Sequence, residues 1–156
     1  MKLVCPHRAL IYLLAFSVVL TPGRLSSQTV TPAGSWSGTW NSPNGSVYSA
    51  SAQFTLTADG ALEGTIRWTL TETRRADLTP KVGQSGTEYV HGTFDARCRV
   101  AVFAGYKLDD PQKILGMDHY QLILAPNGQG FGGVTGNDQG KGDTWTGMVS
   151  LRRSLI

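Results

Sequence analysis

Eight short stretches with the alternating apolar and polar residues of β-strands follow one another along this chain at the spacing of hairpins. They span residues 35–41, 47–57, 61–70, 87–95, 98–107, 118–125, 130–137 and 143–153. The connections alternate between tight turns, such as Asp59-Gly60 and Asn127-Gly128, and longer segments, such as 71–86 and 108–117. An antiparallel meander joined in this way has a closed end with short turns and an open end with long loops.

The second and third stretches carry the clearest pattern. One face of this pair is apolar and includes Tyr48, Phe54, Leu62 and Trp68, whereas the opposite face is mostly polar. Stretches 87–95 and 98–107 alternate less regularly. For stretch 98–107 the pattern favours Val100, Val102 and Tyr106 on the inward face.

We predict an all-β fold, an eight-stranded antiparallel up-and-down barrel formed by a single domain over residues 35–156. A β-sandwich of the same strands is the alternative. The barrel is favoured because closure removes exposed strand edges. One short helical turn is predicted in the loop between strands five and six, where Asp110 would cap it, Pro111 would begin it and Gly116 would end it.

Residues 1–27 have the layout of a secretory signal peptide. Lys2 and Arg8 flank the start of an apolar run over residues 9–20, which Thr21-Pro22-Gly23 interrupts. The run is shorter than the roughly 20 residues that a membrane-spanning helix needs, so no stable membrane insertion is expected. We therefore expect a secreted or periplasmic protein with residues 28–34 as a flexible lead-in. An uncleaved membrane anchor is the alternative.

Removal of this leader changes both the charge and the cysteine content. The sequence has 14 Lys and Arg and 11 Asp and Glu; residues 1–27 contain Lys2, Arg8 and Arg24 and no acidic residue, which leaves 11 of each sign. The mature chain therefore has no excess positive charge to attract nucleic acid. Cys98 is then the only cysteine, so no intrachain disulfide can form. We interpret Cys98 as a buried apolar side chain in preference to a reactive thiol.

Six aromatic residues are predicted to gather inside the open end of the barrel. If the first strand begins at the closed end, the alternation places these rings inward and near the mouth: Trp40, Tyr48, Trp68, Tyr106, Tyr120 and Trp145. Each ring has an apolar face and a polar tip, which suits a flat apolar ligand or a sugar ring. Glu88 is predicted to point inward beside them. The alternative is that the rings simply fill the barrel.

No catalytic, metal-binding or cofactor-binding pattern stands out in the sequence. His91 and His119 lie on different predicted strands, and no H-x-x-x-H, CxxC or G-x-S-x-G motif occurs in the mature chain. Residues 128–133 match G-x-G-x-x-G, but a strand is predicted where a dinucleotide site needs the N-terminus of a helix. We therefore expect a protein without enzymatic activity, without a metal and without a cofactor.

Residues 34–40, with the sequence Gly-Ser-Trp-Ser-Gly-Thr-Trp, resemble the first strand of calycin-type barrels, the group of lipocalins and avidins. Three fragments are similar to avidins in particular: residues 38–40 followed by Gly45-Ser46, residues 59–65 and residues 144–147. The resemblance implies that Arg152 or Arg153 packs on the Trp of the first strand, and that Ser46 contacts a ligand. Avidins line their biotin site with several tryptophans, and here only Trp68 and Trp145 lie beyond the first strand, so the resemblance supports a fold more than a ligand.

Two functional hypotheses follow from the sequence. The first is an exported barrel that binds a small apolar or aromatic molecule, or a sugar, at its open end. The second is a barrel with a filled interior that binds a protein through its long loops, as a protease inhibitor does. Segment 71–86, which is rich in Thr and Arg and contains Pro80 and Gly83, is the natural binding loop for the second hypothesis.

Overall fold

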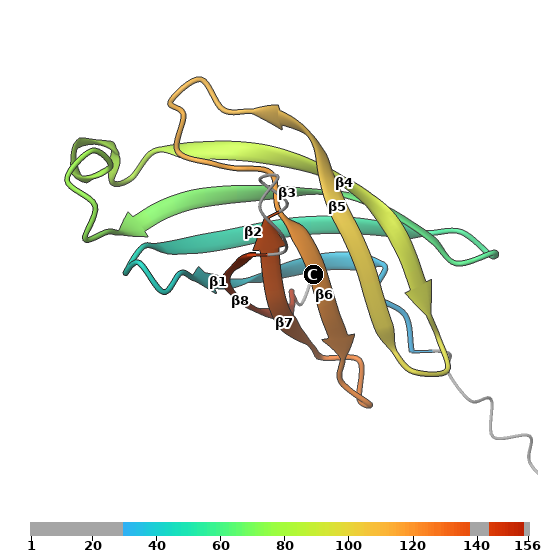
Figure 1. The fold of residues 1–156 in the computed structure, drawn as a ribbon. Helices are drawn as coiled ribbons and strands as arrows, with labels where there is room; N and C mark the ends of the chain where they lie inside the picture. The colour runs from blue at the N-terminus through green and yellow to red at the C-terminus, as the bar shows by residue number, and fades with distance from the viewer. Residues whose placement is uncertain (1–29, 138–143, 155–156) are drawn as a thin grey trace, which may run out of the picture.

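The computed structural model describes residues 30–137 and 144–154, and these form a closed barrel of eight antiparallel strands (Figure 1). The strands are β1 (Gly34–Asn41), β2 (Val47–Leu56), β3 (Ala61–Glu72), β4 (Ser85–Asp95), β5 (Val100–Asp109), β6 (His119–Leu124), β7 (Gly130–Asn137) and β8 (Thr144–Arg153). The predicted up-and-down barrel is confirmed, and the sandwich alternative was wrong. The predicted leader, residues 1–27, lies outside the described residues.

Each strand pairs with its neighbour in chain order, and β1 closes the sheet by pairing with β8. This last pairing runs from Trp36 opposite Arg153 to Asn41 opposite Met148. The two backbones approach closely at Gly38, where a Cβ atom would lie 1.9 Å from the carbonyl oxygen of Ser150. Glycine is therefore the residue that permits closure at this position.

The closed end of the barrel is filled by side chains. Four rings meet there in a chain of contacts: Trp36 and Phe131 have centroids 5.4 Å apart, Phe54 and Phe131 5.9 Å, and Phe54 and Phe103 5.7 Å. Aliphatic side chains complete this floor, among them Leu62, Leu122, Leu124 and Leu151, all fully buried. The tight turns between β2 and β3, β4 and β5, and β6 and β7 lie at this end, and the longer loops lie at the other (Figure 1).

The predicted face of β5 was wrong. Ala101 and Phe103 point into the core, whereas Val102 is 54% exposed and Tyr106 is 55% exposed. Both faces of this strand are largely apolar, so alternation alone does not select one of them. The pairing of β4 with β5 also shifts register, because Tyr89 lies opposite Lys107 while Val90 lies opposite Gly105. Tyr106 lies an even number of residues from Val102, so its ring is on the same outer face of the strand.

The predicted helical turn was also misplaced. In the part of the chain that the structure describes, a single 3-10 turn lies at Thr79–Lys81, in the loop between β3 and β4. In the loop between β5 and β6, Lys113 has a φ of 52°, which reverses the chain where a helix would have continued. Asp110 still organises that loop, because its Oδ2 accepts a hydrogen bond from the backbone N–H of Leu115 at 2.7 Å. No helix in the described part of the chain has the length and hydropathy to cross a membrane.

Cys98 is exposed, which corrects its interpretation as a buried side chain. It lies in the tight turn between β4 and β5, before β5 begins. The carboxylate of Asp95 holds this turn by accepting hydrogen bonds from the backbone N–H groups of Arg97, at 2.8 Å, and Cys98, at 3.2 Å. Turn geometry rather than burial therefore explains the position of Cys98.

Arg153 connects several segments at the closed end of the barrel. Its guanidinium carbon lies 4.4 Å from the ring centroid of Trp36, the arrangement that the resemblance to calycin-type barrels implied. Its nitrogens donate hydrogen bonds to the carbonyl oxygens of Gly128 at 2.9 Å, Ala33 at 2.7 Å and Thr31 at 2.5 Å. One side chain thus ties β8 to the β6–β7 turn and to the segment before β1.

We expect Arg153→Met to lower the free energy of unfolding by about 2–4 kcal/mol, because it removes the cation from the indole face and leaves three carbonyl groups without their donors. Chemical denaturation followed by far-ultraviolet circular dichroism measures this change. Arg152→Met is the matched control, since Arg152 is exposed and we expect a change within about 0.5 kcal/mol. Equal losses in the two variants would contradict the role given to Arg153.

Candidate functional site

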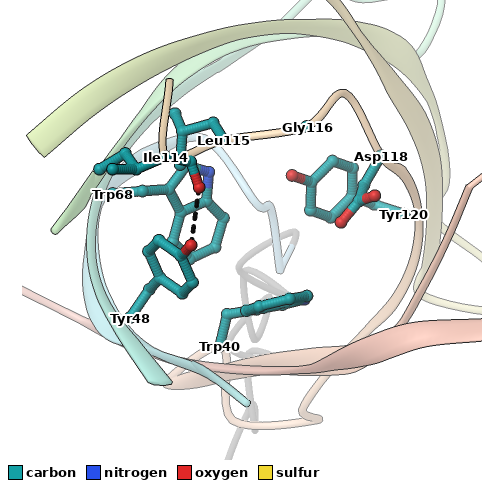
Figure 2. A pocket seen from close by; sticks show the side chains of 8 residues that line it. All are labelled: Trp40, Tyr48, Trp68, Ile114, Leu115, Gly116, Asp118 and Tyr120. Carbon is teal, nitrogen blue, oxygen red and sulfur yellow. Dashed lines mark hydrogen bonds between the residues drawn. The ribbon is translucent and has the colours of Figure 1, made fainter. Parts of the chain in front are cut away.

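A recess at the open end of the barrel is surrounded by aromatic rings (Figure 2). It has a volume of about 50 Å³. Its lining consists of Trp40 from β1, Tyr48 from β2, Trp68 from β3, Tyr120 from β6, and Ile114, Leu115, Gly116 and Asp118 from the β5–β6 loop. Four of the seven predicted site residues therefore meet here: Trp40, Tyr48, Trp68 and Tyr120.

The β5–β6 loop covers one side of the recess. Ile114 is 5% exposed, and its carbonyl oxygen accepts a hydrogen bond from the hydroxyl of Tyr48 at 2.7 Å (Figure 2). The hydrogen bond from the backbone N–H of Leu115 to Asp110 holds the residue after Ile114 in the same loop. The bond from Tyr48 thus attaches this loop to the mouth of the barrel, and the bond to Asp110 holds the loop in its own shape, with its aliphatic side chains beside the rings.

The recess is continuous with a wider vestibule of about 530 Å³. Both share Trp40, Tyr48 and Asp118 among their lining residues. The remaining walls come from three loops and from β8, and include Ser46, Arg75, Asp77, Leu78, Lys113, Trp145 and Thr146. Ser46 is buried and shares a hydrogen bond of 2.9 Å with the hydroxyl of Thr73, and Arg75 forms an ion pair of 2.6 Å with Asp77.

Glu88 is buried beside the recess, with 1% of its surface exposed. Its Oε2 accepts hydrogen bonds from the indole N–H of Trp68 at 3.1 Å and from the hydroxyl of Tyr120, and its Oε1 accepts one from the backbone N–H of Asp118 at 3.2 Å. Burial raises the pKa of Glu88 to about 7, although the hydrogen bonds from Tyr120 and Trp68 act in the opposite direction. Glu88 therefore points inward as predicted, and it holds two of the rings.

Gly105 makes room for this carboxylate. A Cβ atom at position 105 would lie 2.1 Å from Oε1 of Glu88, which is far inside van der Waals contact. The bulge between β4 and β5 sets Gly105 opposite Val90. Nothing in the sequence distinguishes Gly105 from the other 18 of the chain's 19 glycines, so its role becomes apparent only in the structure.

A second polar chain crosses the mouth on the opposite side. The indole N–H of Trp40 donates to Oγ1 of Thr135 at 2.8 Å, Thr135 shares a hydrogen bond of 2.7 Å with Thr146, and Thr146 donates to Oδ2 of Asp118 at 3.1 Å. Burial raises the pKa of Asp118 to about 6, against the hydrogen bonds that lower it. No pattern in the sequence singles out Asp118, Thr135 or Thr146, because each is an ordinary polar residue on its strand or loop.

The polar tips of all four rings are therefore bonded to the protein itself. Trp40 donates to Thr135, Trp68 and Tyr120 donate to Glu88, and Tyr48 donates to Ile114. One face of Tyr120 is also stacked on Phe103, with centroids 4.7 Å apart. A ligand in the recess would therefore contact the surfaces of the rings and the carboxylate of Asp118, which lines both cavities.

Two of the predicted residues lie elsewhere. Tyr106 is on the outside of the barrel, where its ring packs against His91 with centroids 5.0 Å apart, so the inward position predicted for it was wrong. Trp145 is 52% exposed and lines the vestibule but not the recess. Within residues 30–137 and 144–154, no group of three or more His, Cys, Asp or Glu side chains could hold a metal ion.

Comparison with models of known protein families and with curated protein sequences finds no match to this chain.

The raised pKa of Glu88 predicts a pH-dependent stability. Because the folded protein holds this proton more tightly than the unfolded chain, the stabilisation is complete below about pH 4.5 and is lost as the pH rises to about 7. We expect wild type to lose about 3 kcal/mol of unfolding free energy relative to Glu88→Gln over that range. Urea denaturation at a series of pH values measures the difference.

Glu63→Gln is the control for this experiment, because Glu63 is exposed on the same sheet and its variant should keep the pH dependence of wild type. Asp118 titrates in the same direction and its charge also raises the pKa of Glu88, so the difference between wild type and Glu88→Gln includes the interaction between the two carboxyl groups. Parallel pH profiles for wild type and Glu88→Gln would contradict the raised pKa.

Proposed function

We propose that this protein is an exported barrel that binds a small molecule at its open end. The observation that carries the proposal is the unfilled recess among Trp40, Tyr48, Trp68 and Tyr120, which opens into a larger vestibule. Convergence of several aromatic rings around a space, with few polar groups, is typical of sites for small ligands. Export follows from the predicted leader.

The two volumes suggest how a ligand would be divided between them. The vestibule, at about 530 Å³, lies within the range of about 300–1,000 Å³ found for ligand sites. The recess, at about 50 Å³, has room for about three to five water-sized groups. A compact group of the ligand would enter the recess, and the rest of the molecule would occupy the vestibule.

The hydrogen bonds around the rings favour an apolar or aromatic group over a sugar. A sugar ring needs many partners for its hydroxyls, and the tips of the four rings already have partners in the protein. The same bonds support binding rather than catalysis, since both oxygens of Glu88 accept from protein donors. The position of Arg153 over Trp36 supports the proposal that the barrel is calycin-like.

The alternative, a protein-binding barrel that acts through segment 71–86, has less support. Leu78 in this segment is 4% exposed and belongs to the core. The backbone of the segment returns to β3, where Leu70 and Gln84 share a hydrogen bond of 3.0 Å. These contacts make the segment a wall of the vestibule, along with Arg75 and Asp77.

The test is intrinsic tryptophan fluorescence against panels of small aromatic compounds, sugars and lipids. We expect a saturable change with a member of the aromatic panel, because Trp40 and Trp68 line the recess. Gly116→Phe should weaken that binding by at least about tenfold, since position 116 lines the recess and a Cβ there meets only Asn137, at 3.8 Å.

Ser51→Phe is the matched control, because it adds the same ring to the exposed face of β2 and should leave the fluorescence titration unchanged. A spectrum that no compound of any panel alters would contradict the proposed function. Equal effects of the two Phe substitutions would contradict the position given to the site.

A further inference from the structure

We infer that the group held in the recess is an alkylated ammonium, the cationic head of a small organic molecule. The inference deepens the proposed function and rests on it. It comes from three features of the recess: the ring surfaces around it, the charges beside it, and the small number of hydrogen-bond acceptors that it offers.

The rings provide the first feature. Trp40, Tyr48 and Trp68 line the recess from three adjacent strands, and Tyr120 closes it from β6 (Figure 2). Trp40 and Tyr48 meet edge to face, with centroids 5.3 Å apart and an angle of 69° between their planes, so their surfaces form a corner rather than a stack. The faces of aromatic rings carry partial negative charge and attract a cation, most strongly where the cation has lost its water.

The charges around the recess provide the second feature. Among the described residues, those that line it include one carboxylate, Asp118, and no Lys, Arg or His. A second carboxylate, Glu88, is buried behind Trp68 and Tyr120 and hydrogen-bonded to both. Two cations line the vestibule: Arg75, which is paired with Asp77, and Lys113. A cationic group in the recess is therefore favoured electrostatically and an anionic group is disfavoured.

The acceptors distinguish an alkylated ammonium from a primary one. A primary ammonium has three N–H donors, and each would need an acceptor once it left water. Two acceptors at the recess are already occupied: the carboxylate of Asp118 accepts from Thr146 at 3.1 Å, and the carbonyl oxygen of Ile114 accepts from Tyr48 at 2.7 Å. An ammonium whose nitrogen carries methyl groups makes no such demand, and its methyl groups suit ring surfaces and the side chains of Ile114 and Leu115.

The size of the recess agrees with this chemistry. A trimethylammonium head with its first methylene has about as many heavy atoms as the three to five water-sized groups for which about 50 Å³ has room. The remainder of such a molecule would extend into the vestibule beside Ser46 and Trp145.

The experiment compares choline with dimethylbutanol, in which a tert-butyl group replaces the trimethylammonium group and only the charge differs. Both are titrated by tryptophan fluorescence and calorimetry at about pH 8, above the pKa values of both carboxyls. We expect choline to bind at least about tenfold more tightly than dimethylbutanol. Equal affinities would overturn the ammonium inference and leave the proposed function standing.

Asp118→Asn tests the carboxylate with little change of shape. We expect it to weaken choline binding by at least about tenfold and dimethylbutanol binding by less than about twofold. Asp109→Asn removes the same charge from an exposed position at the end of β5 and should change neither affinity. Choline binding that survives Asp118→Asn unchanged would overturn the role of Asp118.

The remaining outcomes separate the two proposals. If neither choline nor dimethylbutanol binds while an aromatic compound does, the ammonium inference is wrong and the proposed function stands. If no compound of any class binds, both are wrong. Unfolding midpoints of every variant, measured by circular dichroism, show that each affinity refers to a folded protein.

Discussion

The pairing of β1 with β8 closes the sheet into a barrel and thereby sets where every other strand directs its side chains. Once these strands pair, no sheet edge remains and every inward side chain faces the same limited interior. The close approach at Gly38 allows the backbones to meet, and Arg153 fastens the end of β8 over Trp36. The exposed Cys98 has no partner among the described residues, so closure and packing rather than a disulfide hold the domain together.

The two ends of the barrel differ in how side chains fill the interior. At the closed end, Phe54, Phe103 and Phe131 pack against one another and against aliphatic side chains, which leaves a solid floor. At the open end, the rings are held by hydrogen bonds through their polar tips. Glu88 holds Trp68 and Tyr120, and the pair of threonines holds Trp40. Rings fixed at their tips cannot collapse onto one another, and the recess persists between them.

A buried carboxylate is a costly way to position two rings, and the cost is visible in the raised pKa of Glu88. Three hydrogen-bond donors to the carboxylate and the room that Gly105 leaves beside it offset this cost. A packed apolar core would have been simpler and more stable. Two carboxyl groups beside ring surfaces are therefore expected where the mouth of the barrel has a task that an apolar plug could not perform.

The barrel, the limits of most strands and the end at which the rings gather can be predicted from the sequence alone, because alternation with period two and turn chemistry are local properties. The sequence pattern placed Trp40, Tyr48, Trp68, Glu88 and Tyr120 correctly. It misplaced Tyr106, since both faces of β5 are apolar and alternation alone does not select the inward one. Three features become apparent only in the folded chain: which polar tips are hydrogen-bonded, the room that Gly105 leaves for Glu88, and the position of Asp118 at the recess. These are contacts between distant strands, and no local pattern encodes the distance between two side chains that closure of the barrel brings together.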